Sequence, residues 1–206
     1  MGRIFRLPVN GKPISILDFS GIPSEALNIV VSVVSRLAFE LATWSERKIP
    51  ILLVCEEAHR YIPRDRSLGF HSTRRIISRI AKEGRKYGIS LGLITQRPSD
   101  LAEGVLSQCG TIISMRLNNE RDQAFVKAAM PEGARGFLDS IPALRNREII
   151  CCGEGVAIPI RVSLDTLAEE RRPASEDPVF SDLWREHGGE EDIIDRVVKR
   201  WRNQGR

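Results

Sequence analysis

Two adjacent acids follow directly after an apolar run that is typical of a buried strand. Residues Ile51–Cys55 are all apolar, and Glu56 and Glu57 come next without a break. A run of this kind is expected of a strand buried on both faces of a parallel sheet. The carboxyl ends of such strands form the edge where ligands bind. Carboxylates placed there could hold a magnesium ion and could position or deprotonate a water molecule.

A second polar strand end stands about forty residues later. The apolar segment Ser90–Ile94 ends in Thr95-Gln96-Arg97-Pro98. In P-loop enzymes, the first acid of such a pair holds Mg²⁺ through water, and the second orients the attacking water. A polar side chain on the neighbouring strand would then meet the γ-phosphate. Two acids that merely end a strand in solvent are common, so the acid pair alone is weak evidence for a functional site. The second polar strand end strengthens that interpretation.

The elements that would position these residues alternate between strand and helix. Such alternation predicts an α/β fold with a mostly parallel sheet flanked by helices. The last two strands are expected to form an antiparallel pair across 153–155 at one edge of the sheet. The predicted strands are 14–19, 51–55, 90–95, 111–115, 148–152 and 156–162, and the predicted helices are 24–44, 72–87, 101–108 and 120–129.

The composition favours one main domain with an extension. The chain has 206 residues, of which 42% are hydrophobic, and this is enough to bury one sizeable core. We expect residues 1–165 to form that core. Residues 166–206 are predicted to form an acidic linker and a helical brace, with an amphipathic helix over 191–204.

Neither a membrane span nor a metal-binding cysteine framework is expected. The most hydrophobic segment, 22–44, is interrupted by Arg36 and Glu40, which predicts a buried helix of a soluble protein. No C-x-x-C pair occurs among the four cysteines, Cys55, Cys109, Cys151 and Cys152. A zinc site or a disulfide framework is therefore not predicted, and the cysteines indicate the reducing cytoplasm.

Charge is segregated along the chain, although the net charge is only +4. Between Arg60 and Arg97 there are ten Lys or Arg and two acids, whereas 165–195 holds eleven acids and three Arg. The basic segment could face a polyanion, because Lys and Arg gain affinity by releasing the counterions of phosphates. It could equally be the solvated face of a helix. Composition does not separate these two interpretations.

Three stretches of the chain resemble the HerA/FtsK branch of RecA-like ATPases, which includes HerA-like helicases and the ATPases of conjugation and type IV secretion. The stretches are ILLVCEEAHRYIP, RIAKEGRKYGISLGLITQRPSDL and GEGVAIPIRV, and the resemblance covers roughly residues 14–165. It implies a RecA-like (P-loop NTPase) fold and an ATP-driven translocase or helicase acting on double-stranded DNA. It further implies a homo-oligomeric, hexameric ring with ATP between subunits, and a partner nuclease of the NurA kind. An export motor and a non-catalytic DNA- or protein-binding module are the alternatives.

The resemblance also implies roles for individual residues. Glu56 would be the Mg²⁺-associated acid, Glu57 the catalytic glutamate and Gln96 the sensor of the γ-phosphate. Arg85 would be the arginine finger that acts on a neighbouring subunit, and its alternative is a surface arginine of a basic helix. Arg116, just past the next strand, is the substitute nucleotide-binding arginine. Aspartate is commoner in the family at the position of Glu56, but a water between acid and metal can absorb the extra methylene.

Two further features qualify this assignment. For His59 we prefer packing beside its strand over a relay between nucleotide and DNA.

The phosphate-binding loop, G-x-x-x-x-G-K-[ST], is missing: Gly11-Lys12 is the one Gly-Lys dipeptide, and Arg6 and Pro13 break the pattern around it. In the family this loop precedes the strand predicted at 14–19. The chain is therefore expected to begin partway through the ATPase domain and, alone, to bind nucleotide poorly and be inactive.

Overall fold

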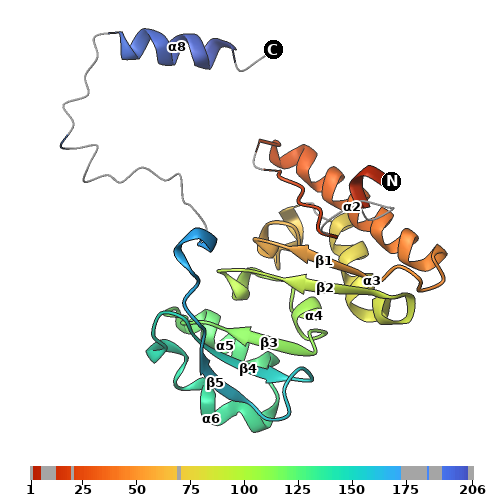
Figure 1. The fold of residues 1–206 in the computed structure, drawn as a ribbon, viewed down its shortest axis with the longest axis vertical. Coiled ribbons are helices and arrows are strands. Elements are labelled where there is room, and N and C mark those ends of the chain that lie inside the picture. The colour runs from red at the N-terminus through yellow and green to blue at the C-terminus, as the bar shows by residue number, and fades with distance from the viewer. Residues whose placement is uncertain are drawn as a thin grey trace. The chain divides into compact units, whose positions relative to one another are not determined.

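The computed structural model describes residues 2–5, 13–19, 21–68, 71–172, 185 and 192–203. The chain divides into two units, residues 1–164 and residues 165–206. The first unit contains five strands and the helices around them (Figure 1). Its elements are α1 (Gly2–Phe5), α2 (Ser24–Trp44), β1 (Ile51–Cys55), α3 (His71–Tyr87), β2 (Ile89–Leu93), α4 (Glu103–Leu106), β3 (Thr111–Ser114), α5 (Glu120–Ala129), α6 (Arg135–Leu138), β4 (Glu148–Gly153) and β5 (Ile160–Ser163). The second unit contains α8 (Ile193–Asn203).

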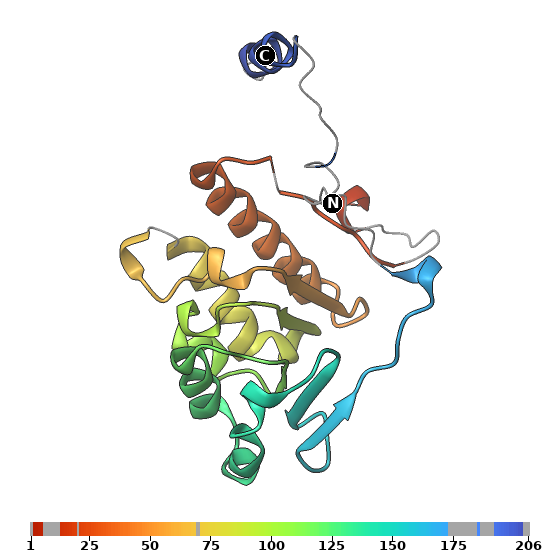
Figure 2. The same ribbon diagram turned by 90° about the vertical axis from the view of Figure 1, so that its left-hand side faces the viewer.

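Strands β1 and β2 form the predicted parallel pair, and helices cover one of its faces. The register runs from Ile51 opposite Ile89 to Cys55 opposite Leu93. Alternate residues of both strands pack against α2 and α3, because successive side chains of a strand point to opposite faces. Helix α3 turns Ile76, Ile77 and Ile80 into this core at helical spacing, as predicted. Figure 2 shows the two helices beside the strand pair.

The opposite face of β1 is bare. Leu52 is 65% exposed and Val54 is 50% exposed, although both are as apolar as the residues that alternate with them. The expectation of a strand buried on both faces is therefore met on one face only. Within the described residues, nothing packs over these two side chains enough to bury them.

A second, antiparallel sheet is formed by β3, β4 and β5 in that order. The β4–β5 pairing confirms the antiparallel pair expected across 153–155. The antiparallel pairing of β3 with β4 was not predicted. Residues of β4 and of the helical segments before it form a second core, which includes Val126, Met130, Ile141, Leu144 and Ile150.

Two predicted strands differ from the structure. Residues 13–19 have no regular secondary structure, so the strand predicted at 14–19 is wrong for this structure. Ile14 is 63% exposed and Ile16 is 87% exposed, because none of the described strands pairs with this segment and its apolar side chains stay in solvent. The strand predicted from Val156 starts instead at Ile160, because the turn that reverses the chain after β4 extends through that interval.

Helix α2 is long and apolar enough to cross a membrane by length and composition alone. Its Ala38, Phe39 and Ala42 are buried in the core against α3 and the β1–β2 pair. The Phe39 ring meets the Tyr87 ring edge to face at 5.2 Å between centroids. The guanidinium of Arg79 lies 4.4 Å from the centroid of Phe39. These contacts fit the predicted core helix.

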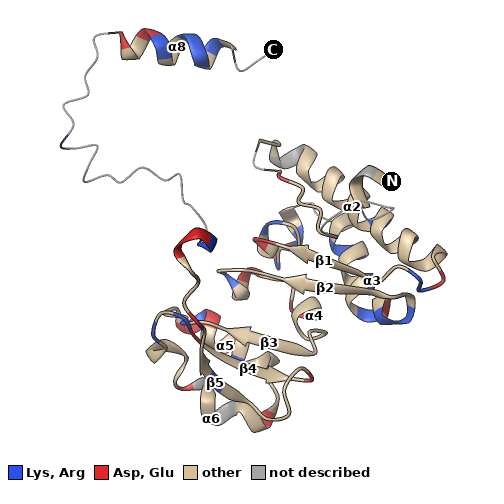
Figure 3. Ribbon diagram, viewed as in Figure 1, with Lys and Arg blue, Asp and Glu red and all other residues tan. Residues whose placement is uncertain are grey.

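Helix α8 in the second unit buries none of its described residues. Ile194, Val197 and Trp201 are exposed at helical spacing. Basic residues occupy much of the remaining surface of this helix (Figure 3). The helix is therefore amphipathic, as the sequence predicts for this segment.

Candidate active site

The two predicted strand ends are joined beyond the strands themselves. The amide of Ile94 donates to the carbonyl of Cys55 at 3.0 Å, and the amide of Ala58 donates to the carbonyl of Ile94 at 2.9 Å. Between these bonds the chain turns at Glu57, whose φ of 48° and ψ of 45° lie in the left-handed region. Few residues other than glycine adopt this conformation, and such residues gather at functional sites. The turn places the Glu57 side chain at the same edge as the end of β2.

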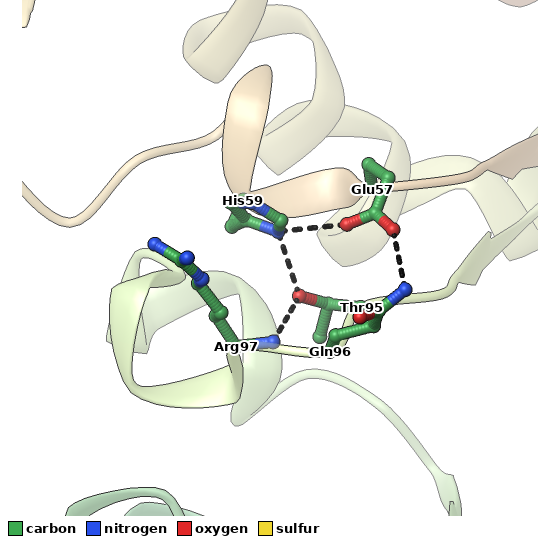
Figure 4. A network of polar contacts seen from close by, with 5 residues as sticks. All are labelled: Glu57, His59, Thr95, Gln96 and Arg97. Atoms are coloured by element: carbon green, nitrogen blue, oxygen red, sulfur yellow. Dashed lines mark hydrogen bonds and ion pairs between the residues drawn. The ribbon is translucent and has the colours of Figure 1, made fainter. Parts of the chain in front are cut away.

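Glu57 and Gln96 are in direct contact. The Gln96 Nε2 donates to Glu57 Oε1 at 3.0 Å (Figure 4). The expectation that neighbouring parallel strands bring these two side chains together is therefore confirmed. This geometry would allow the Glu57 carboxylate and the Gln96 amide to contact one small ligand together.

His59 and Thr95 extend this contact into a four-residue network. The Nδ1 of His59 lies 3.3 Å from Glu57 Oε2 and 3.0 Å from Thr95 Oγ1. The Thr95 hydroxyl also accepts from the amide of Arg97 at 3.0 Å. Packing, which we preferred for His59, is thus an incomplete description, because its ring is also bound to the carboxylate. The spacing of His59, two residues after Glu57, was the available signal for the histidine, and Thr95 begins the polar strand end that the sequence had indicated.

Glu56 has the exposure expected of an acid that meets a hydrated ion. Its side chain is exposed and forms no hydrogen bond or ion pair with another described residue. The described residues contain no group of three or more His, Cys, Asp or Glu that could hold a metal ion alone. Magnesium usually keeps several waters and is held by one or two carboxylates together with phosphates. Glu56 therefore fits a water-mediated contact with Mg²⁺ at a nucleotide, and not a metal site built from protein ligands alone.

The two candidate arginines do not join this network. Arg85 is exposed in the last turn of α3, just before β2 begins, so the length of β2 separates it from Gln96. A five-residue strand spans about 17 Å at roughly 3.3 Å per residue. Arg116 is exposed after β3 and, within the described part of the chain, contacts neither Glu57 nor Gln96. Neither arginine completes the site within one copy of the chain.

Cys55, which immediately precedes the two acids, is not a candidate nucleophile. Its side chain is buried against the helices, and burial raises its pKa to about 11. A thiol of that pKa is almost entirely protonated near neutral pH, and the thiolate is the reactive form. The chemistry available at this edge therefore belongs to the carboxylates, the amide and the imidazole.

Similar sequences occur among helicases of archaea, although no family model matches the chain. The chain is 37% identical over 155 residues to the DNA double-strand break repair helicase HerA of Pyrococcus furiosus, covering 75% of this chain and 26% of that protein. It is 28% identical over 194 residues to HerA of Sulfolobus acidocaldarius, covering 91% of this chain and 38% of that protein. The chain thus spans roughly a quarter to two fifths of the length of these relatives.

Solved structures with a similar fold include viral packaging enzymes. The genome packaging NTPase B204 of Sulfolobus turreted icosahedral virus 2, in complex with ATP-gammaS, superposes with a TM-score of 0.54. The match covers 76% of this chain and 69% of that one, at 13% sequence identity. A sequence identity this low supports a shared fold and no shared function. The chain has the P-loop NTPase type of α/β fold, with a parallel pair of strands flanked by helices.

Proposed function

Because the chain is related in sequence to HerA helicases over most of its length, we propose that it forms part of an ATP-driven DNA translocase. The observation that supports this most directly is the contact between Glu57 and Gln96 at the ends of two parallel strands. A motor of this kind needs a carboxylate to orient water and a polar group to report on the terminal phosphate. Both are present at one edge.

In this proposal, Glu57 is the general base of hydrolysis. Its Oε1 accepts from Gln96 and its Oε2 lies next to His59, so both carboxylate oxygens are engaged. A catalytic water would take the place of one of these contacts and would be oriented by the freed oxygen. Gln96 would then turn its amide toward the γ-phosphate. The hydrogen bond between the two residues is thus the resting arrangement of the site.

Nucleotide and metal would be held only partly by the described residues. Glu56 would hold a water of Mg²⁺, and the ion would neutralise charge on the phosphates when bound. No sequence in the chain matches the loop that cradles the phosphates through backbone N–H groups. We propose that a segment outside these 206 residues supplies it. Tight, Mg²⁺-dependent ATP binding by the chain alone would contradict this part of the proposal.

Free strand edges support such an added segment. β2 pairs with β1 on one side only, and β3 pairs with β4 on one side only, among the strands that the structure describes. The bare apolar side chains Leu52 and Val54 lie on the same strand pair. An additional strand along β2, followed by a helix over the bare face, would satisfy both the backbone groups and these side chains.

A ring would explain why Arg85 lies far from Glu57 in one copy. An exposed arginine at the opposite end of β2 can reach the nucleotide of a neighbouring subunit, where its guanidinium would stabilise charge on the transferred phosphoryl group. Arg116 is the substitute for this role. The hexameric state belongs to the proposal.

Double-stranded DNA is the proposed substrate, and a NurA-like nuclease is the proposed partner. The relatives are named for the repair of DNA double-strand breaks, and this favours a DNA motor over a protein-export motor and over a binding-only module. The cytoplasm is the corresponding proposed location.

The test is Glu57→Gln in a longer protein that contains the phosphate-binding segment. We expect the rate of ATP hydrolysis to fall by about a hundredfold or more, because general-base catalysis contributes roughly 10²–10⁴-fold. Nucleotide binding should persist, since the variant keeps the size of the side chain and loses only its charge. Steady-state phosphate release and binding of a fluorescent ATP analogue measure the two effects.

Glu103→Gln is the matched control, because Glu103 is an exposed acid in α4. It should leave hydrolysis unchanged. An unchanged rate in Glu57→Gln would remove Glu57 from the catalytic role.

A further inference from the structure

A pocket of about 530 Å³ lies beside His59 and has no role in the function proposed above. Its walls come from the segment after β1, from the short 3-10 turn Pro98–Asp100 and from the first turn of α5. Between β1 and α3 the chain carries Arg60, Arg64 and Arg66 together with three acids, Glu56, Glu57 and Asp65 (Figure 3).

Specific bonds hold the three walls together. The amide of Arg64 donates to the carbonyl of Asp100 at 2.7 Å, and Pro63 forms a bridge with Leu101. The amide of Ser99 donates to the carboxylate of Asp122 at 2.9 Å, and both residues are buried. The pocket is thus shaped by the fold before any ligand arrives, which lowers the entropic cost of binding.

Three arginines line the pocket, Arg60, Arg64 and Arg121. None of them forms an ion pair with a residue that the structure describes. The guanidinium of Arg64 is placed over the ring of Phe125, 5.8 Å from its centroid, and this contact limits its orientation. Arginines arranged in this way are suited to an oxyanion.

Two acids, Asp65 and Asp100, also line the pocket and limit the charge of its ligand. The amide of Ser67 donates to Asp65 Oδ1 at 2.8 Å, and this bond lowers the pKa of the Asp65 carboxyl and keeps it ionised. Three cations and two anions leave an excess of one positive charge. A phosphodiester carries one negative charge and matches this excess, whereas a nucleoside triphosphate carries several.

We infer that this pocket binds a phosphodiester group of a nucleic-acid backbone, with Arg64 and Arg121 as its main contacts. Pro63 and Leu68 offer apolar surface to the adjoining sugar. The choice of nucleic acid rests on the proposed function, but the residues of the pocket are separate from Glu57 and Gln96. His59 lines the pocket and also contacts Glu57, so a bound phosphodiester would lie one side chain away from the proposed catalytic carboxylate.

The test measures DNA binding by the 206-residue chain without nucleotide. Fluorescence anisotropy of a short labelled duplex gives the Kd for the parent chain and for the double variant Arg64→Gln, Arg121→Gln. We expect the Kd to rise about tenfold and the slope of log Kd against log salt to fall by about one, as for the loss of one phosphate contact. Competition with ATP and with inorganic phosphate separates the sources of phosphate, and the unlabelled duplex should displace the label best.

Two further variants keep the inference falsifiable. The pair Arg75→Gln, Lys82→Gln removes the same charge from exposed positions of α3 outside the pocket, and its Kd should change less than threefold. The pair Arg64→Lys, Arg121→Lys keeps the positive charge and should retain most of the affinity. It replaces the Gln pair as the test of the pocket if circular dichroism shows that the Gln pair has misfolded. Equal loss in the α3 pair, unchanged binding in the pocket pair, or no binding by the parent chain would overturn the inference. ATP turnover of Glu57→Gln in the longer protein is an independent measurement, so either proposal can fail alone.

Discussion

Strand β1 carries similar apolar residues toward both faces of the β1–β2 pair, and the two faces have opposite surroundings. On one face, Cys55 and Ile89 are at most 7% exposed beneath α2 and α3. On the other face, Leu52 and Val54 stay at least half exposed. In the function proposed above, the apolar composition of β1 reflects a cover that the described residues do not supply. The bare face is where the proposed additional segment would pack.

The sharpest way to test the covered face is Ile77→Ala in α3. Ile77 is fully buried in the core between α3 and the strands. We expect the free energy of unfolding to fall by about 2–5 kcal/mol, because the change removes buried methyl groups and leaves a cavity. Urea denaturation followed by circular dichroism measures it. A loss below about 1 kcal/mol would mean that this face is much less tightly packed than described.

Thiol labelling compares the two faces directly. Cys55 lies on the covered face with a pKa of about 11, and Val54→Cys would place a thiol on the bare face. At pH 8, two pKa units alone make Cys55 about a hundredfold less ionised than an ordinary thiol, and burial slows it further. Iodoacetamide labelling with peptide mass spectrometry resolves the two sites. Similar rates at both sites would remove the distinction between the faces.

Leu52→Thr should have the smallest effect. Since Leu52 is 65% exposed, we expect the free energy of unfolding of this chain to change by no more than about 0.5 kcal/mol. In a longer protein that covers the face, the same substitution should cost about 1–2 kcal/mol, because apolar area would then be buried. Equal effects in the two proteins would contradict the proposed cover.

Local patterns were sufficient for the parts of the fold that hold the candidate site. The buried side of α3 follows from the spacing of Ile76, Ile77 and Ile80. The contact between Glu57 and Gln96 follows from two parallel strands that end at one edge. In both cases, a regular element converts spacing in the sequence into position in space, so no long-range information was needed.

Other features depend on contacts between segments that no local pattern encodes. The apolar run at 14–19 reads as a strand, but it pairs with none of the described strands, and pairing depends on the partner segment as well as on the run itself. Arg64 and Arg121 line the same pocket because the chain around Pro63 pairs with Leu101 and because Asp122 holds Ser99. The link between His59 and Thr95 likewise arises only when the two strand ends meet.

The unpaired edges of β2 and β3 also govern how this chain behaves as a sample. Among the described strands, each leaves a row of backbone donors and acceptors without a partner, and β2 lies beside exposed leucine and valine. Such edges are templates for stacking one molecule onto the next, and natural proteins protect them with charge, bulges or covering segments. Solutions of the chain alone should therefore aggregate as their concentration rises, and co-expression with the proposed additional segment should give a more monodisperse preparation.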